Sequence, residues 1–177
     1  MDDREALLTL IRDLAVVRGR VVLSSGQESD WYLDLRRVSL HHAGAPLVGR
    51  VMRRLTADWE YDAVGGLTLG ADPVATAMLH AAAAAGERLD AFIVRKEGKA
   101  HGLQRRIEGP DVAGRRVLAV EDTVTTGGSV LTAVEALREA GATVIGIAAV
   151  VDRGASANLA SAGLPYRAAY TLTDLSL

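Results

Sequence analysis

The sequence predicts an α/β domain in which helices flank a central, mostly parallel sheet. From residue 62 onward, short apolar segments alternate with segments of helical length, which is the pattern of strands joined by crossover helices. Thr143–Val151 is a continuous apolar run rich in Val and Ile, typical of a strand covered on both faces. The 177 residues, of which 49% are hydrophobic and 24% charged, fit one folded domain with a sizeable core. We therefore expect residues 1–177 to form a single domain.

The first part of the chain predicts two helices and a pair of strands. Asp2 and Glu5 resemble a capping box, and the apolar residues that follow recur at helical spacing up to residue 17, with Gly19 as the stop. A polar turn at 25–27 separates two short segments of strand-like composition. The expected elements are a helix at 3–17, strands at 21–23 and 31–35, and a helix at 45–55.

The remaining elements follow from the alternation itself. Pro73 stands at a permitted first-turn position of an alanine-rich helix, and Gly141 closes a later helix. The expected strands are 62–66, 91–95, 115–120, 143–151 and 166–172, and the expected helices are 72–85, 129–140 and 156–162.

Composition argues against several classes of function. A net charge of −2 does not indicate a surface for nucleic acid or membranes, and no apolar run is long enough to cross a bilayer. The chain has no cysteine, which excludes disulfides, thiolate metal sites and a cysteine nucleophile, and which fits a reducing compartment. The acidic start, Met1–Glu5, does not resemble a signal peptide. We therefore expect a cytoplasmic protein that binds neither nucleic acid nor membrane.

Residues 96–113 form a polar segment that is too long to be a simple connection between strands. The segment contains glycines and a proline, and a loop of this length in a compact domain is more often a functional lid than filler. Lys96 and Lys99 are the only lysines of the chain. Two explanations of them carry about equal weight: chance clustering on a solvated loop, and a need for compact ammonium charges beside phosphate oxygens.

Residues 117–131 carry the strongest functional signal. An apolar strand is expected to end in two adjacent acids, Glu121 and Asp122, and a turn rich in hydroxyl groups and glycine then leads into a helix. Gly127 and Gly128 permit a tight turn in which backbone N–H groups converge. The helix N-terminus adds a positive dipole, so this turn suits a phosphate. Further hydrogen-bond donors are the hydroxyl groups of Thr123, Thr125, Thr126 and Ser129.

The two adjacent acids favour a ligand over a purely structural turn. Glu121 and Asp122 could accept hydrogen bonds from neighbouring sugar hydroxyls or hold a hydrated magnesium ion. The alternative is a strand–turn–helix unit in which the Thr and Ser residues act only as helix caps. Without a ligand or cation, however, consecutive acids at the end of an apolar strand would face desolvation and mutual repulsion. A Walker A loop is excluded because no lysine follows the glycines.

This segment resembles the signature of the phosphoribosyltransferase family, in which a hydrophobic strand leads to two acids and a Thr/Gly loop. Other segments are similar to those of the orotate phosphoribosyltransferases. Leu23–Arg36 has the pattern S-G-x-x-S-x-x-Y-x-D-x-R, and Phe92–Gly102 has the pattern R-K-x-x-K-x-H-G. Gly65–Pro73 stands where the family carries its pyrophosphate loop, and the pair Asp152-Arg153 matches a pair that helps to hold orotate. The resemblance covers nearly the whole chain in the expected order.

The resemblance implies a fold, an activity and an assembly. The fold is that of the type I phosphoribosyltransferases, with a small N-terminal hood over about residues 1–40 and a flexible lid loop over about residues 96–113. The activity converts orotate and 5-phosphoribosyl 1-diphosphate (PRPP) to orotidine 5′-phosphate and diphosphate in de novo pyrimidine (UMP) biosynthesis, with Mg²⁺ as the metal. The assembly is a homodimer in which each lid reaches into the active site of the neighbouring subunit.

The resemblance also implies the site residues, in four groups. The catalytic residues, which would contact the diphosphate of PRPP, are Arg95, Lys96, Lys99 and His101. The residues for the ribose hydroxyls and the 5′-phosphate are Glu121, Asp122, Thr123, Val124, Thr125, Thr126, Gly127, Gly128 and Ser129. The residues for orotate are Thr125 and Arg153. Glu121 and Asp122 would hold the metal indirectly, through the ligand or water.

Two positions depart from the family pattern. Ser24 stands where many members have Lys, and Leu69-Gly70 stands where many have Tyr-Lys, so two positive charges near the donor are absent. Either the remaining cations compensate, or the donor binds more weakly.

Several alternatives stay open at the level of the sequence. His101 taken alone would be a solvated loop residue, and Arg153 could instead pair with the preceding aspartate or cap the next helix. Trp31 and Tyr32 are more typical of core or subunit-interface aromatics than of base-stacking groups. A purine or uracil phosphoribosyltransferase is an alternative function, but it gives no reason for the Arg-Lys lid motif. A PRPP-sensing regulator that binds nucleic acid is another, but it would need a basic face or an added segment.

Overall fold

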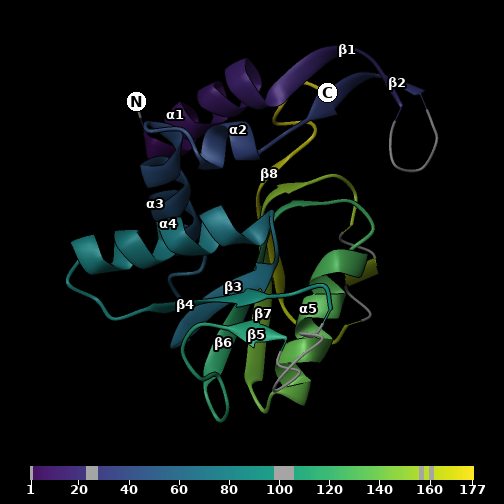
Figure 1. Cartoon of the computed structure of the whole chain (residues 1–177). Coiled ribbons are helices and arrows are strands. Elements are labelled where there is room, and N and C mark those ends of the chain that lie inside the picture. Colours follow the sequence, from purple (N-terminus) through teal and green to yellow (C-terminus); the bar gives the residue numbers. More distant parts are fainter. Residues whose placement is uncertain (1, 23–27, 98–105, 156–157, 160–161) are drawn as a thin grey trace.

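The computed structural model describes residues 2–22, 28–97, 106–155, 158–159 and 162–177, and Figure 1 shows their arrangement. The helices are α1 (Asp3–Leu10), the π-helical turn η1 (Ile11–Ala15), α2 (Arg36–Ser39), α3 (Gly44–Leu55), α4 (Ala71–Ala84) and α5 (Gly128–Glu139). The strands are β1 (Val16–Val22), β2 (Glu28–Leu33), β3 (Ala63–Leu67), β4 (Asp90–Val94), β5 (Ile107–Glu108), β6 (Arg116–Val124), β7 (Thr143–Asp152) and β8 (Tyr166–Thr171).

A six-stranded sheet with the order β5-β4-β3-β6-β7-β8 forms the centre of the molecule. All neighbours pair in parallel except β4 and β5, which are antiparallel. After β3, the chain adds β4 and β5 on one side of it. From β6 onward it adds strands on the other side, so the direction of the strand order reverses between β3 and β6. Ligands of open α/β sheets bind beyond the carboxyl ends of the strands at such a reversal. The topology therefore confirms the expected mostly parallel sheet and places a candidate site beyond β3 and β6.

Helices cover both faces of this sheet, as Figure 1 shows for α3 and α4 on one side and α5 on the other. Alternate residues of β6 enter separate cores. Leu118 and Val120 pack in the core that contains α3 and α4, whereas Val117 and Ala119 pack in the core that contains α5. A strand that is buried on both faces has no solvent-exposed face for polar side chains, which explains the continuous apolar runs in the sequence.

The N-terminal residues form a small unit above the sheet, consisting of α1, η1, the antiparallel pair β1–β2 and α2 (Figure 1). We call these residues, 2–22 and 28–39, the hood. The hood is tied to the last strand of the sheet. The guanidinium of Arg4 donates a hydrogen bond to the carbonyl of Ala169 at 2.8 Å, and the hydroxyl of Tyr170 donates one to the carbonyl of Arg4 at 2.7 Å.

Several expected elements have other bounds in the structure, where the strand expected at 21–23 corresponds to β1 (Val16–Val22) and the strand expected at 31–35 to β2 (Glu28–Leu33). The first helix does not run to residue 17, because η1 follows α1 and β1 already begins at Val16. The strand expected to end at Val120 continues to Val124, since it goes on pairing with β7. The short elements α2 and β5 were not expected at all; β5 lies within the predicted lid segment and attaches part of it to the sheet. Of the helix expected at 156–162, residues 156–157 and 160–161 lie outside the described residues, and Asn158 and Leu159 are helical.

None of the helices in the described residues combines the length and the apolar character that a membrane span requires.

Candidate functional site

A cleft of about 760 Å³ opens at the carboxyl edge of the sheet, where β3 and β6 lie side by side. Its floor comes from the residues that follow β3 and from the end of β6. One wall comes from the hood, at Tyr32–Arg36, and Lys96 and Arg153 reach it from the segments after β4 and β7. The cleft therefore collects residues from segments that are far apart in the sequence.

Glu121 and Asp122 stand at the bottom of this cleft. They lie within β6 rather than after it, so their backbone is held by the pairing with β7. Only 6% of Glu121 is exposed. Burial, and next the charge of Asp122, raises the pKa of Glu121 to about 8. Burial also raises the pKa of Asp122, against a short hydrogen bond of 2.6 Å that the backbone N–H of Thr123 donates to its Oδ1.

The raised pKa values of Glu121 and Asp122 show that the protein alone does not fully stabilise the charged form of these carboxylates. Burial shifts both groups toward the protonated form, and the charge of Arg36, which acts on Asp122, does not offset it. A cation or the hydroxyl groups of a bound ligand would supply what is missing. This agrees with the expectation that the two acids serve a ligand.

The turn after β6 wraps around a small cavity of about 30 Å³ lined by Glu121 and residues 123–130. Gly127 has a φ of 87°, which lies in the left-handed region that favours glycine, and α5 begins at the next residue. A side chain at Gly127 would also meet Leu159, whose Cδ2 would be 2.7 Å from an added Cβ. The hydroxyl of Thr123 is buried without a hydrogen-bond partner. An orphan donor and a helix N-terminus around one small cavity form a site for a phosphate-sized anion.

The loop after β3 lies directly against the two acids. A Cβ added at Gly70 would be 2.6 Å from Oδ1 of Asp122 and 2.7 Å from Oε1 of Glu121, so only glycine fits there without a shift. The hydroxyl of Thr68 donates a hydrogen bond to Oδ2 of Asp72 at 2.7 Å, while Oδ1 of Asp72 is buried without a partner. Gly70, one of the two positions that depart from the family pattern, is therefore fitted to the acids of this chain.

The hood contributes a polar wall opposite the acids. Arg36 donates from Nε to Oδ1 of Asp34 at 3.0 Å and from an Nη atom to the hydroxyl of Tyr32 at 3.4 Å. The charge of Arg36 also acts to lower the pKa of Asp122, so it lies within electrostatic reach of the acids. From the sequence, Tyr32 is expected in the core or at a subunit interface, and Asp34 and Arg36 receive no separate role, although all three belong to the pattern Y-x-D-x-R. Only the fold brings them to the cleft.

Arg153 enters the cleft from the turn that follows β7. This turn is fixed by Asp152, whose Oδ1 accepts hydrogen bonds from the backbone N–H groups of Gly154 at 2.8 Å and Ala155 at 2.7 Å. The guanidinium of Arg153 lies over the ring of Trp31, with Cζ 5.0 Å from the ring centre. Burial lowers the pKa of Arg153, and its Nε is buried without a hydrogen-bond partner. A partly desolvated guanidinium of this kind suits a carboxylate ligand.

The four expected diphosphate-contacting residues have different outcomes. Lys96 lines the cleft. Arg95 does not line it; its Nη1 lies 3.3 Å from Oε1 of Glu108 on the antiparallel strand β5, in a partly exposed ion pair. Lys99 and His101 lie outside the described residues, as does Ser24. All nine residues from Glu121 to Ser129 are described, and each of them lines the cleft or the small cavity.

The described residues contain no group of three or more His, Cys, Asp or Glu side chains that could hold a metal ion on their own. Glu121 and Asp122, which line the cleft, nevertheless offer carboxylate oxygens, and such oxygens are what Mg²⁺ prefers. The arrangement fits a magnesium ion that is shared with a bound ligand or with water, rather than one enclosed by protein.

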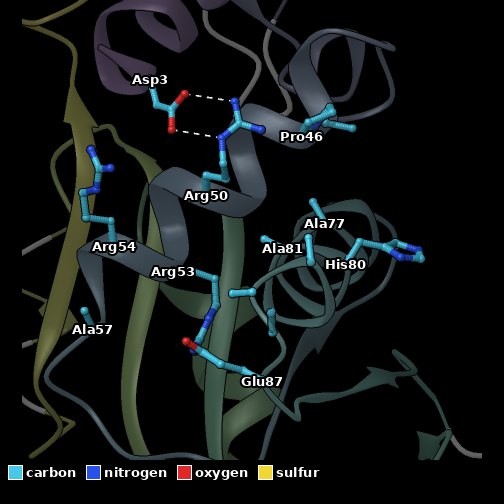
Figure 2. Close-up of a pocket in the computed structure, with 14 residues that line it drawn as sticks. Asp3, Pro46, Arg50, Arg53, Arg54, Ala57, Ala77, His80, Ala81 and Glu87 are labelled. Carbon is cyan, nitrogen blue, oxygen red and sulfur yellow. Dashed lines mark hydrogen bonds and ion pairs between the residues drawn. The ribbon is translucent and has the colours of Figure 1, made fainter.

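A second cavity, of about 870 Å³, lies between α3 and α4 and is shown in Figure 2. Its surface is formed largely by alanines such as Ala77 and Ala81, which allow the two helices to approach closely. Each arginine that lines it already has an acidic partner. The pairs are Arg50 with Asp3, Arg53 with Glu87, and Arg54 with Asp2. This groove is away from the strand ends, and its charges serve to join α3 to neighbouring segments.

Comparison with known proteins agrees with the fold. The family model described as "Phosphoribosyl transferase domain" matches residues 38–163. The orotate phosphoribosyltransferase of Streptomyces avermitilis is 66% identical over 181 residues, with 100% of both chains covered. The orotate phosphoribosyltransferase of Mycobacterium tuberculosis in complex with Fe(III) dicitrate matches with a TM-score of 0.91 at 58% identity, covering 99% of this chain and 100% of that chain. The structure of the M. tuberculosis enzyme in complex with PRPP matches with a TM-score of 0.87 at 53% identity, with the same coverage.

Proposed function

This chain belongs to the orotate phosphoribosyltransferase family, and from that premise we propose how its cleft joins orotate to the phosphoribosyl group of PRPP. The reaction displaces diphosphate from the anomeric carbon of the sugar by a ring nitrogen of orotate. The products are orotidine 5′-phosphate and diphosphate, and the step belongs to the synthesis of UMP. The observation that carries the proposal is the pair of adjacent acids, the buried Glu121 and the partly buried Asp122, beside a turn suited to an anion at the strand-order reversal.

The 5′-phosphate of PRPP is held by the turn from Thr125 to Ser129. Its backbone N–H groups and the N-terminus of α5 provide donors and a positive dipole, and the hydroxyls of Thr123, Thr125, Thr126 and Ser129 add further donors. Glu121 and Asp122 accept hydrogen bonds from the two ribose hydroxyls. Binding would then stabilise the charged form of both acids, which the free protein disfavours.

Orotate is held by Arg153 and Thr125. Orotate carries a carboxylate, and a guanidinium binds a carboxylate through two parallel hydrogen bonds. Arg153 lines the cleft beside Thr125 and Ser129, so a planar carboxylate ligand bound there would lie next to the sugar.

The chemistry requires stabilisation of the leaving diphosphate more than activation of a nucleophile. Orotate can supply its nitrogen as an anion, so no protein nucleophile is needed, and sugar transfers of this kind pass through oxocarbenium-like states. Arg95, Lys96, Lys99 and His101 would hold the diphosphate as preorganised cations and donors. A bound magnesium ion would supply further neutralisation of the diphosphate charge. Exclusion of water by the lid would strengthen each of these interactions.

The working form is proposed to be a cytoplasmic homodimer. Lys96 lines the cleft of its own subunit, whereas Lys99 and His101, on the lid, would serve the cleft of the neighbouring subunit. Within the predicted lid of residues 96–113, β5 pairs with β4 and attaches that part of the segment to the sheet.

The proposal is tested by following the loss of orotate absorbance in the presence of PRPP and Mg²⁺. Adenine, hypoxanthine and uracil are offered as competing acceptors. We expect consumption of orotate and little inhibition by the other bases, because they have no carboxylate for Arg153. Transfer to a purine or to uracil in preference to orotate would contradict the assignment.

A further inference from the structure

Trp31 of the hood contacts Arg153, which follows the end of β7, and the proposed reaction gives this contact no role. The ring of Trp31, on β2, lies against the guanidinium of Arg153, with 5.0 Å between Cζ and the ring centre. Arg153 lines the cleft, but Trp31 is not among the residues that line it. The indole therefore lies behind the guanidinium with respect to a ligand in the cleft.

Trp31 is itself firmly placed. Its backbone pairs with Arg18 of β1, and its N–H and carbonyl both bond to the hydroxyl of Ser29, at 3.3 and 2.7 Å. Its side chain is half-buried and packs against the core that contains α1, α3 and α4. A rigid aromatic face of this kind limits the positions that a guanidinium can occupy.

Arg153 needs such a support, because its own surroundings fix it incompletely. Asp152 fixes the backbone of the turn through Gly154 and Ala155, but Nε of Arg153 is buried without a hydrogen-bond partner. An arginine has a long side chain and loses considerable rotational freedom when it is held in one position. A guanidinium that is already held against a ring binds a carboxylate without that loss.

We propose that Trp31 is a positioning residue for orotate, which acts by holding the guanidinium of Arg153 in the orientation that receives the carboxylate. This inference rests on the proposed role of Arg153 in binding orotate. It assigns to the hood a part in selecting the acceptor base, since a base without a carboxylate gains nothing from a correctly oriented Arg153.

The chain provides a matched control for this contact. Trp59, the other tryptophan, lies under the guanidinium of Arg167 at 4.4 Å, and Arg167 also forms an ion pair with Asp58 at 2.5 Å. Neither Trp59 nor Arg167 lines the cleft. Substitution of Trp59 removes the same type of contact at a place where no substrate is expected.

The test compares Trp31→Leu, Trp31→Phe and Trp59→Leu by steady-state kinetics and thermal unfolding. We expect Trp31→Leu to raise the KM for orotate about 5- to 30-fold, the range that corresponds to a desolvated cation–π contact of about 1–2 kcal/mol. The KM for PRPP should change less than about twofold. Trp31→Phe, which keeps an aromatic face, should recover most of the loss, and Trp59→Leu should leave both KM values unchanged.

Inhibition by uracil separates positioning from a general structural effect. Uracil has no carboxylate, so its inhibition constant should be the same in the wild type and in Trp31→Leu. An equal weakening of orotate, uracil and PRPP would show that Trp31 only supports the fold, and it would overturn the inference.

A double-mutant cycle with Arg153→Ala decides whether Trp31 acts through Arg153. We expect the double variant Trp31→Leu/Arg153→Ala to bind orotate no more weakly than Arg153→Ala alone. If the wild type consumes orotate but the two effects add, the role of Trp31 is overturned while the proposed function stands. If the wild type does not consume orotate, the proposed function fails, and this inference fails with it.

Discussion

Glu121 and Asp122 bring two adjacent carboxylates into the cleft, one buried and one partly buried, and the consequence is a site whose charge depends on its ligand. Burial, and next the charge of Asp122, raises the pKa of Glu121 to about 8, so the ligand-free protein favours its protonated form near neutral pH, and burial also raises the pKa of Asp122. Hydroxyl groups of a bound sugar or a shared cation would reverse this preference. The two acids therefore lower the stability of the ligand-free protein, and such a cost is expected where side chains serve to bind a ligand.

The raised pKa of Glu121 predicts a stability that falls as the pH rises. Its folded-state pKa is about 8, compared with an ordinary value of 4.5. Between these two values the folded state binds more protons than the unfolded state, so the free energy of unfolding decreases with increasing pH. One pKa unit corresponds to about 1.4 kcal/mol, and we expect the ligand-free protein to lose at least that much between about pH 5 and about pH 8.

Chemical denaturation of Glu121→Gln across the same pH range tests whether the ionisation of Glu121 causes this loss of stability. The variant should show a shallower decrease, because an amide does not ionise, whereas Glu135→Gln, at an exposed position of α5, should follow the wild type. Identical pH dependence of Glu121→Gln and the wild type would assign the effect to another group.

Lys99 is expected to act on catalysis rather than on folding. It would contact the leaving diphosphate, and loss of one such contact costs on the order of 3 kcal/mol in the transition state, or roughly a hundredfold in turnover. Lys99→Ala should show this loss with an unchanged melting temperature, and Arg138→Ala, at an exposed position of α5, should change neither. Unchanged turnover in Lys99→Ala would refute its assigned role.

At the scale of single residues, the sequence predicts the residues of the candidate site where they follow one another in one local segment. The run from Glu121 to Ser129 is such a segment, because acids, glycines and hydroxyls follow one another in the order in which they line the cavity. The wall formed by Tyr32, Asp34 and Arg36 could not be placed in this way. Its position against the acids depends on how the hood docks on the sheet, and no local pattern records that docking.

At the scale of elements, the turn between β6 and α5 illustrates how a backbone conformation makes a site. Gly127 has a φ of 87° and lies against Leu159, so a side chain there would face both backbone strain and a clash. The turn can therefore direct its N–H groups inward only while this position is glycine.

Gly127→Ala should destabilise the protein and weaken PRPP binding together. We expect a loss of about 1–3 kcal/mol, read as a fall in melting temperature, and a higher KM for PRPP. Gly114→Ala is the matched control, because Gly114 also has a positive φ, of 72°, but has no atom near an added Cβ. Equal losses in the two variants would show that the packing against Leu159 contributes nothing.

Elements were predicted well where they are long and periodic, and poorly where tertiary contacts decide their ends. The alternation from residue 62 to residue 151 gave the order of β3, α4, β4, β6, α5 and β7. β6 runs past the acids because Thr123 and Val124 pair with β7, which is a contact between distant segments. β5 consists of two residues and exists only through β4, so no periodicity could reveal it.

At the scale of the whole molecule, the family resemblance and the proposed lid together predict active sites shared between two subunits. The described residues of one subunit provide the acids, the phosphate turn and Arg153. In the proposal, Lys99 and His101 come from the neighbouring subunit. Because β5 is paired with β4 in the sheet, the predicted lid of residues 96–113 is reduced mainly to the residues before β5.

Hybrid dimers test this sharing. Lys99→Ala lacks a lid cation, and Glu121→Ala/Asp122→Ala lacks the acids, so each variant alone should be nearly inactive. If each lid serves the other subunit, a mixture that exchanges subunits should regain about a quarter of the wild-type activity, because half of its dimers hold one intact site. A mixture that exchanges subunits and stays inactive would place the lid over its own cleft.

The central claim is that the buried acids of β6 hold the sugar donor during transfer to orotate. Its most direct measurement is the rate of orotate consumption, with PRPP and Mg²⁺, by the wild type, by Glu121→Ala/Asp122→Ala, and by Asp111→Ala, which changes an exposed acid far from the cleft. We expect the double variant to lose at least about a hundredfold in rate while remaining folded, and Asp111→Ala to match the wild type. A folded double variant that consumes orotate at the wild-type rate would contradict the claim.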